Sequence, residues 1–383
     1  MKKTLIALAA VAVAGTAFAQ NVTISGTLDV QAVNNSKSTT IADTKGVADK
    51  VDTKTAAPGN NGWATSELRF SGSEDLGGGL TASFQLNTGL GNGNQTLANR
   101  DRFLNLSGGF GSVRIGNFTP ATDGSAAFGG HGTTLTAGSA DTITNAGHGR
   151  QVAMQYTTPN MSGFTASVVY SSGKVDKAGA EGKGGKDLSG LAFNYAQGPL
   201  RVGAGTSKLT TNVEAAAGKA GFCVTAATTS PLSASSAASS CTGAAVGHTQ
   251  DVSASKTKNT QNYLGASYDL GVATVSASHL TGKISKAGVN SADIKLNTLG
   301  VTVPVGAITL TASMYRGKDK VSSATDDDYN LRGHQVTARY ALSKRTFVYA
   351  AMGENDRKRT GGNTEKGAAN KTKQTTMGLV HSF

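Results

Sequence analysis

The chain has 383 residues, and its 36 lysine and arginine residues outnumber 24 aspartate and glutamate residues, giving a formal net charge of +12. No helical pattern with interleaved aromatic residues carries this charge, which argues against nucleic acid as a partner. Past the N-terminal segment there is no run of about 18 apolar residues, so we expect no transmembrane helix, and 50 glycines against six prolines favour turns and strand bends over helices.

Residues 1–19 have the features of a removable export signal. Two lysines follow the first methionine, an apolar stretch runs from Leu5 to Ala14, and small residues end at Ala19. We therefore expect cleavage between Ala19 and Gln20, and one exported domain over residues 20–383.

The clearest pattern in the mature chain is an alternation of apolar and polar residues with a period of two. Near its start, Val22, Ile24 and Leu28 share one face, and Ser25 and Asp29 share the other. An amphipathic helix would instead place residues three and four apart on one side. The pattern predicts sixteen strands, near 21–33, 64–73, 80–88, 100–107, 111–118, 150–158, 163–172, 188–196, 200–208, 260–269, 272–280, 292–303, 307–316, 331–342, 345–353 and 374–383.

The connections between these strands alternate between short turns and long polar loops. The long ones fall at 34–63, 89–99, 119–149, 173–187, 209–259, 281–291, 317–330 and 354–373. This alternation is typical of an outer-membrane barrel with short periplasmic turns and long extracellular loops. Lipid offers no hydrogen-bond partner to an open sheet edge, so the first and last strands must pair. The sequence predicts an all-β, sixteen-stranded antiparallel transmembrane β-barrel whose lumen can hold water.

Two cysteines, Cys223 and Cys241, lie in the polar stretch 209–259. Export to an oxidising compartment favours a disulfide between them over two free thiols. Neither a CxxC motif nor a nearby histidine pair accompanies them, so we expect no metal site. A passive channel carries out no chemistry, so we expect no cofactor either.

Three stretches resemble the general porin family of Gram-negative bacteria, particularly its β-proteobacterial and neisserial branch. They are residues 68–80 (LRFSGSEDLGGGL), 103–116 (FLNLSGGFGSVRIG) and 378–383 (GLVHSF). The resemblance implies a homotrimer of sixteen-stranded barrels in the outer membrane, through which small hydrophilic solutes diffuse. It also implies that the third long loop, residues 119–149, folds inward and narrows each channel.

The resemblance suggests which residues line that constriction. Arg100 and Arg150 match positions of a basic ladder on the channel wall, whereas another ladder position holds Glu67, and Arg69 two residues on is its candidate substitute. Arg102 lies two residues from Arg100 and is a further candidate. In the inward loop, Asp123 matches a position that is often acidic. Ala127 departs from the acidic residue of cation-preferring members, which weakens the case for cation selectivity.

Strand parity gives an independent count of charges on the inner face. Seven basic and three acidic residues fall there: Arg69, Arg100, Arg102, Arg114, Arg201, Lys295 and Arg339, against Asp29, Glu67 and Asp293. A positive lumen attracts anions, so we expect weak anion selectivity. The same parity turns Leu104 and Leu106 towards the lumen and Phe103 outwards, which either a bulge or an error of register would explain.

These observations favour a passive diffusion channel over two other classes of protein. An outer-membrane enzyme would need a nucleophile and a base together, and we find no Gly-x-Ser-x-Gly or comparable arrangement. An adhesin or structural barrel would act through its long loops and stays an alternative. Expected partners are outer-membrane lipid, small solutes and anions. Lipopolysaccharide phosphates are a further candidate, for the basic run 357–359, although a solvated loop fits that run equally well.

The terminal Phe383 completes an alternating strand. Its simplest role is that of a lipid-facing aromatic residue at the membrane interface. The family resemblance implies an added role as the signal recognised by the outer-membrane assembly machinery.

Overall fold

The computed structural model of the protein describes residues 22–42, 48–60, 62–91, 99–123, 148–175, 184–213, 222–223, 245–246, 255–286, 289–321, 327–360 and 369–383. These residues form strands, turns and irregular connections. No helix among them is long and apolar enough to cross a membrane.

The strands of this part of the chain, in order, are β1 (Thr23–Ala42), β2 (Ala48–Asn60), β3 (Glu67–Gly77), β4 (Leu80–Gly89), β5 (Arg102–Gly108), β6 (Gly111–Phe118), β7 (Gln151–Thr157), β8 (Phe164–Val175), β9 (Gly184–Gln197), β10 (Leu200–Val213), β11 (Phe222–Cys223), β12 (Ala245–Val246), β13 (Ser255–Asp269), β14 (Thr274–Lys286), β15 (Val289–Val305), β16 (Ile308–Val321), β17 (Asp327–Ala341), β18 (Thr346–Arg359) and β19 (Ala369–Ser382).

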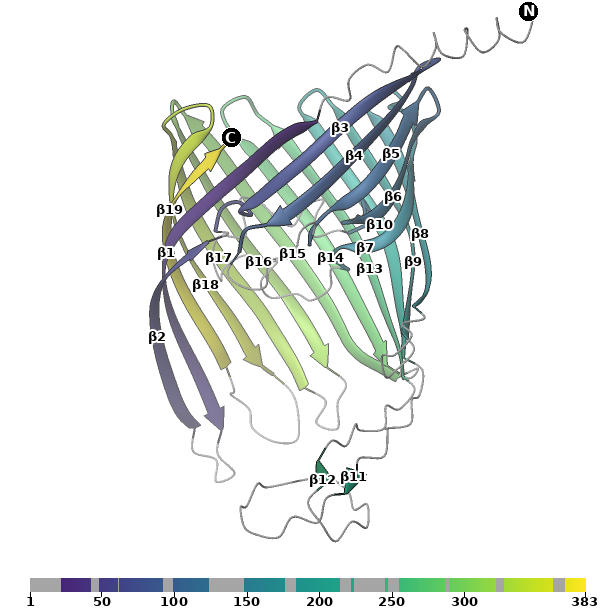
Figure 1. Cartoon of the computed structure of the whole chain (residues 1–383). Helices are drawn as coiled ribbons and strands as arrows, with labels where there is room; N and C mark the ends of the chain where they lie inside the picture. The colour runs from purple at the N-terminus through teal and green to yellow at the C-terminus, as the bar shows by residue number, and fades with distance from the viewer. Residues whose placement is uncertain are drawn as a thin grey trace, which may run out of the picture.

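Sixteen of these strands, all except β2, β11 and β12, form one closed antiparallel barrel (Figure 1). Successive strands pair around the wall, and β1 pairs with β19 from Thr27 opposite Ser382 to Thr39 opposite Asn370. The predicted sixteen-stranded antiparallel barrel and its closure by the first and last strands are confirmed. Closure leaves the barrel wall without an open edge, as a strand-built membrane span requires.

The last residue takes part in closing the barrel. The amide of Gly26 donates to the carbonyl of Phe383 (2.9 Å), and the amide of Phe383 donates to the carbonyl of Gly26 (3.0 Å). A Cβ atom at position 26 would overlap the Phe383 ring, so the ring lies over the glycine. The pairing therefore extends to the end of the chain and includes the aromatic side chain.

Burial is inverted relative to a water-soluble protein. On β19, Thr376 is 1% exposed, whereas its neighbour Met377 is 60% exposed. On β17, Gln335 and Thr337 are both 1% exposed, and Val336 between them is 48% exposed. Polar side chains thus face the interior and apolar side chains face outwards, the alternation expected of a barrel in lipid.

Strands extend beyond several of the predicted boundaries. β1 continues to Ala42 and pairs with β2 from Val30 opposite Asn60 to Ala42 opposite Ala48. Much of the predicted loop 34–63 is therefore a two-stranded extension of the wall. Figure 1 shows this hairpin reaching past the ends of β3 and β4. Its residues lack the apolar alternation because they lie beyond the apolar belt, so strand pairing there left no pattern in the sequence.

The cysteine prediction is only partly within the described residues. Cys223 lies on β11, which pairs with β12 through Cys223 opposite Ala245 and Phe222 opposite Val246. Cys241 lies outside the described residues, so the disulfide stays a prediction. The export signal, residues 1–19, and Ala127 also lie outside them.

Candidate functional site

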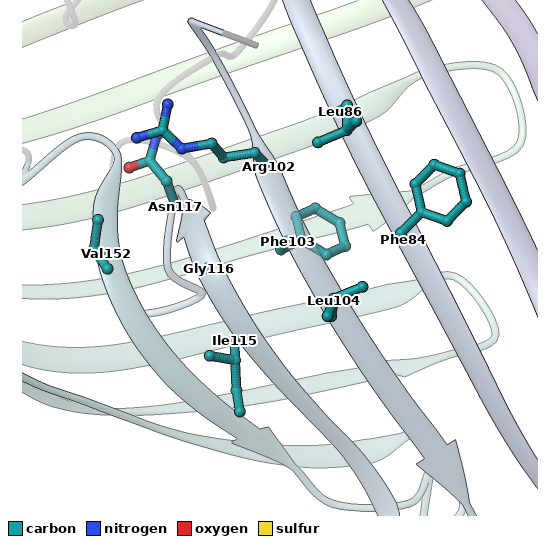
Figure 2. Close-up of a pocket in the computed structure, with 9 residues that line it drawn as sticks. All are labelled: Phe84, Leu86, Arg102, Phe103, Leu104, Ile115, Gly116, Asn117 and Val152. Atoms are coloured by element: carbon teal, nitrogen blue, oxygen red, sulfur yellow. The ribbon is translucent and has the colours of Figure 1, made fainter.

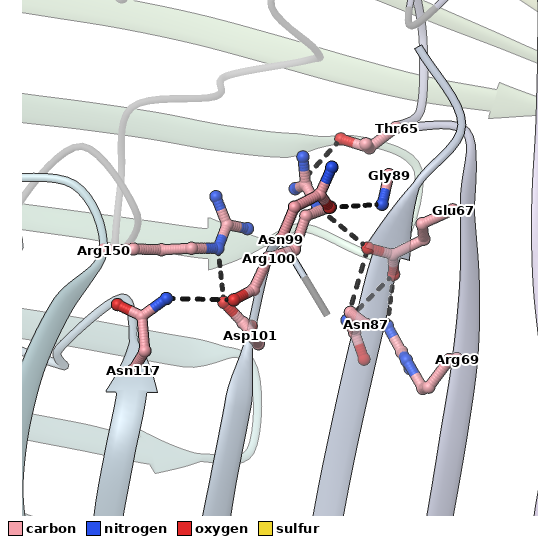
Figure 3. Close-up of polar contacts among 10 residues, drawn as sticks. All are labelled: Thr65, Glu67, Arg69, Asn87, Gly89, Asn99, Arg100, Asp101, Asn117 and Arg150. Atoms are coloured by element: carbon pink, nitrogen blue, oxygen red, sulfur yellow. Dashed lines mark hydrogen bonds and ion pairs between the residues drawn. The ribbon is translucent and has the colours of Figure 1, made fainter. Parts of the chain in front are cut away.

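The candidate site lies where the short strands of the barrel end. Five consecutive strands, β3 to β7, are short, with 7 to 11 residues each. The other barrel strands are longer: β8 to β10 and β13 to β19 have 12 to 17 residues each, and β1 is longer still. The short strands stop partway along the wall (Figure 1), and charged side chains gather at the rim that they form (Figure 3). We call this group, Glu67, Arg69, Asn87, Arg100, Asp101 and Arg150, the rim cluster.

Glu67 is the centre of the rim cluster. Its carboxylate accepts from Nη2 of Arg69 (2.7 Å), from Nε of Arg100 (3.1 Å) and from Nδ2 of Asn87 (3.2 Å). The Glu67 side chain is 13% exposed, against 44% for Arg69 and 25% for Arg100. The carboxylate is therefore enclosed by donors, while parts of both guanidinium groups reach solvent.

A break in strand alternation brings Arg100 into this cluster. The amide of Arg100 donates to the carbonyl of Asn87 (3.1 Å), and the amide of Asn87 donates to the carbonyl of Asp101 (2.7 Å). Two consecutive residues therefore oppose one residue of β4, which is the arrangement of a β-bulge. Because of the bulge, both Arg100 and Asp101 contribute their side chains to the rim cluster, as Figure 3 shows.

Arg102 lies on the opposite face, contrary to the prediction that it lines the lumen. It pairs with Leu86 and shares its face with Leu104, which is 69% exposed. Figure 2 shows Arg102 beside a shallow outer hollow lined by Leu86, Leu104, Ile115 and Val152. The bulge shifts the parity by one residue, so Leu104 faces outwards and Phe103 inwards. The conflict over Leu104 is therefore due to a bulge and not to an error of register.

Arg150 joins the rim cluster from the start of β7. Its Nε donates to Oδ1 of Asp101. Asn117, at the end of β6, donates to the carbonyl of Arg100 (3.0 Å). Together these contacts link the ends of β5, β6 and β7, so the predicted pair Arg100 and Arg150 does lie in one cluster, each held by its own carboxylate.

The base of the third long loop lies against the inner wall. Tyr263 of β13 donates its hydroxyl to the carbonyl of Ala121 (2.9 Å), and Ser207 of β10 donates to the carbonyl of Thr122 (3.2 Å). Asp123 accepts from the amide of Gly149 (2.8 Å), which joins the two ends of the loop. Asp123 is 1% exposed, so it holds the loop base rather than facing channel water.

The burial of His148 is a second feature of the loop base. Its side chain is 7% exposed, and burial lowers its pKa below the usual 6.5, with the nearby charge of Asp123 acting in the opposite direction. The lowered pKa favours a neutral imidazole at neutral pH at the base of the loop.

The structure revises the predicted inner-face charges. Lys295 pairs with Thr281 and alternates with buried Ile294 and Leu296, so it faces outwards, and Asp293 does so too. The inner face keeps Arg69, Arg100, Arg114, Arg201 and Arg339, against Asp29 and Glu67. Arg102, Lys295 and Asp293 are no longer part of the predicted inner-face set. The charges that remain in the set still have a positive balance.

Two of these arginines stack on aromatic rings. The guanidinium of Arg114 lies 4.3 Å from the ring centroid of Phe103, and that of Arg339 lies 5.0 Å from the centroid of Phe347. A cation over the face of an aromatic ring is attracted by the ring quadrupole and keeps its charge. These contacts therefore favour the positions of the two charges on the wall.

The sequence analysis did not predict some residues of the site. Asp101 was missed because simple parity turned it away from Arg100, and Asn87 because an amide in a polar strand face gives no distinct signal. Arg357, predicted to lie in a long loop, is on β18 and donates to Oδ2 of Asp319 on β16 (2.8 Å). The run 357–359 is thus part of a strand, with Lys358 pointing away from Arg357.

Comparison with known proteins identifies related chains. The model of the family described as Gram-negative porin matches residues 4–360. Outer membrane porin protein 32 of Delftia acidovorans is 28% identical over 373 residues, which cover 92% of this chain and 89% of that protein. The major outer membrane protein P.IB of Neisseria gonorrhoeae is 32% identical over 221 residues, which cover 55% of this chain and 60% of that protein.

Solved structures share the same fold. An anion-selective porin from Comamonas acidovorans aligns with a TM-score of 0.62 and 22% identity, covering 95% of this chain and all of that one. The trimer form of OmpT from Vibrio cholerae aligns with a TM-score of 0.62 and 16% identity, covering 95% of this chain. At these identities the likeness establishes the architecture of the barrel.

Proposed function

Because this chain belongs to the Gram-negative porin family and is an outer-membrane protein, we propose that it forms a water-filled channel for passive diffusion of small hydrophilic solutes, with a weak preference for anions. The observation that carries the proposal is the charge balance of the rim cluster. Three guanidinium groups, of Arg69, Arg100 and Arg150, meet two carboxylates, of Glu67 and Asp101. The excess cation lies on the wall beside the loop base, where rings of basic side chains favour anions.

A salt-gradient measurement of reversal potential tests the preference. Arg100→Ala removes one cation of the rim cluster and should shift the reversal potential towards cation permeability. Arg102→Ala, two residues away on the outer face, is the matched control and should leave selectivity unchanged. A wild-type channel with clear cation preference, or equal effects of the two variants, contradicts the proposal. Single-channel conductance separates this function from an adhesin, which would not conduct.

A homotrimer is part of the same proposal. The outer face of β4 to β7 presents Leu86, Leu104, Ile115 and Val152, of which the last three are 57–69% exposed. An apolar surface formed by the short strands suits contact with a second copy of the chain. A solved structure with the same fold is described as a trimer form, which supports the proposal.

Trimer formation can be tested on the same face. Leu104→Asp should convert trimers to folded monomers on unheated gels, because a carboxylate would be buried at the contact. Leu264→Asp, on β13 and 56% exposed, is the control and should retain the trimer. Trimers that survive Leu104→Asp would place the contact elsewhere.

A further inference from the structure

The connection between β2 and β3 leaves the wall of the barrel. Val30 of β1 lies opposite Asn60, the last residue of β2, and Thr27 lies opposite Glu67, the first residue of β3. The ladder is therefore interrupted for two residues on β1 and for six residues on the other side. Six residues are too many to continue the pairing. We call the described part of this connection, residues 62–66, the inner segment.

Hydrogen bonds hold the inner segment against the lumen side of β1. The amide of Ala64 donates to Oδ2 of Asp29 (2.7 Å), and the hydroxyl of Ser66 accepts from the amide of Asp29 (3.0 Å). The hydroxyl of Tyr349 on β18 donates to Oδ1 of the same carboxylate (2.7 Å). Asp29 is 1% exposed, so its charge is enclosed by these donors. Trp63 is thereby held at the inner wall.

Trp63 packs on two aromatic residues of β18. Its ring centroid lies 5.5 Å from that of Phe347 and 5.6 Å from that of Tyr349. Val348, which lies between these two residues in the strand, is exposed on the outer face, so Phe347 and Tyr349 both point inwards. Tyr349 is buried, whereas Trp63 and Phe347 are only partly buried. Two aromatic rings therefore present apolar surface on the inside of the barrel.

Arg339 of β17 adds a cation to these rings. Its Cζ lies 5.0 Å from the ring centroid of Phe347 and 6.0 Å from that of Trp63. Within the described part of the chain, its guanidinium has no carboxylate at ion-pair distance, and its buried Nε has no hydrogen-bond acceptor. A buried donor without an acceptor is unfavourable, so this group favours an acceptor that a solute brings.

The aromatic rings and Arg339 lie close to the rim cluster. Thr65 of the inner segment accepts from Nη2 of Arg100 (3.4 Å), as Figure 3 shows. Trp63 is two residues from Thr65 in the same segment. An anion that the rim cluster attracts is therefore brought near Trp63 and Arg339.

We propose that Trp63, Arg339 and Phe347 form a binding site for small aromatic carboxylates on the inner wall. A guanidinium group matches the two oxygens of a carboxylate with paired N–H donors, and it also stacks on aromatic faces. The rings of Trp63 and Phe347 offer the aromatic ring of the solute a packing surface beside that cation. An apolar lining with one well-placed polar group is typical of small-molecule sites. The inference rests on the proposed function, because the solute reaches the site through channel water.

The fluorescence of Trp63 reports on the site directly, because this residue is the only tryptophan of the chain. Full-length protein in detergent is titrated with 4-nitrobenzoate, whose nitroaromatic ring quenches indole emission on contact. Quenching should saturate, and benzoate should reverse it by competition. The uncharged 4-nitrobenzyl alcohol should bind about tenfold more weakly. Cyclohexanecarboxylate, which has the charge without the aromatic ring, should compete about fivefold less well than benzoate.

Variants of Arg339 assign the carboxylate contact. Arg339→Gln should weaken binding of 4-nitrobenzoate about tenfold and leave binding of 4-nitrobenzyl alcohol unchanged. Arg339→Lys keeps the charge and loses the paired donors, so its affinity should lie between those of wild type and Arg339→Gln. The matched control is Arg345→Gln, in the exposed turn two residues before Phe347, and it should bind as wild type does. Heat-resistant migration on unheated gels shows that each variant is assembled.

Three results would overturn the inference. They are quenching that never saturates, equal affinity of wild type for 4-nitrobenzoate and the alcohol, and equal losses in Arg339→Gln and Arg345→Gln. Conductance in a planar bilayer is recorded on the same preparations. A channel that conducts and does not bind 4-nitrobenzoate refutes the site alone, whereas a protein that binds it and does not conduct refutes the proposed function.

Discussion

At the scale of single residues, the rim cluster is organised by one carboxylate. Glu67 is largely enclosed and accepts hydrogen bonds from Arg69, Arg100 and Asn87. An enclosed charge is tolerated when such partners surround it, and removal of one member leaves the others uncompensated. Glu67 thus both positions two arginines and cancels part of their charge.

Glu67→Gln separates these two effects. The loss of a charged acceptor should lower the free energy of unfolding by about 1–3 kcal/mol. It should also increase anion selectivity, because the charges of Arg69 and Arg100 are no longer offset. Thermal unfolding and reversal potential are measured on the same preparation. A shift towards cation permeability would show that the arginines leave the channel wall when Glu67 is lost.

Selectivity at this scale could be predicted only in part from the sequence. Glu67, Arg69, Arg100 and Arg150 do lie together. Strand alternation turned Glu67, Arg69 and Arg100 towards the lumen, whereas Arg150 was suggested by the family resemblance alone. Arg102 was misplaced because a bulge adds one residue to a strand and leaves the amino-acid pattern intact. The sign of this bulge in the sequence was the assignment of Leu104, an apolar residue, to the water-facing side of its strand.

At the scale of elements, the last strand docks through its terminal residue. Phe383 pairs with Gly26 through two backbone hydrogen bonds, and its ring occupies the space above that glycine. A side chain at position 26 would force the ring aside. The seam of the barrel therefore depends on a small residue in β1 as much as on the aromatic residue in β19.

Gly26→Val tests the seam. Overlap with the Phe383 ring should cost about 1–3 kcal/mol and reduce the fraction of heat-resistant, assembled protein. Gly109→Val, at a turn where an added Cβ has open space, is the control. Deletion of Phe383 should likewise reduce assembly without altering export. If assembly is unchanged in both seam variants, neither the packing nor the predicted assembly signal holds.

The base of the third loop is an element with a pH dependence. The pKa of His148 is lowered by burial, so the released loop binds a proton more readily than the seated one. Stability of the seated base is present above the ordinary histidine pKa and is lost as the pH falls below it. Single-channel recordings from pH 7 to pH 5 should show growing current fluctuations. His148→Asn should remove this dependence, whereas His279→Asn on the exposed outer face should retain it.

The strand positions were predictable and their outer limits were not. All sixteen barrel strands could be located, because each strand alternates apolar residues that face lipid with polar residues that face the lumen. Beyond the apolar belt, as in Asn34 to Thr39 of β1, both faces are polar and the pairing is carried by the backbone. Such pairing is independent of side-chain type, so the β2 hairpin had no signature.

At the scale of the whole molecule, the seam determines when the barrel can form. Thr27 and Ser382 meet across it although 355 positions separate them in the chain. Loop closure over such a distance has a large entropic cost, and proteins dominated by distant contacts fold slowly. Until β1 and β19 pair, two strand edges stay open to pairing with other chains. Because the closing contact joins two strands that lie so far apart in the chain, those edges stay open until the rest of the wall is in place, and the chain depends on protection throughout its transit to the membrane.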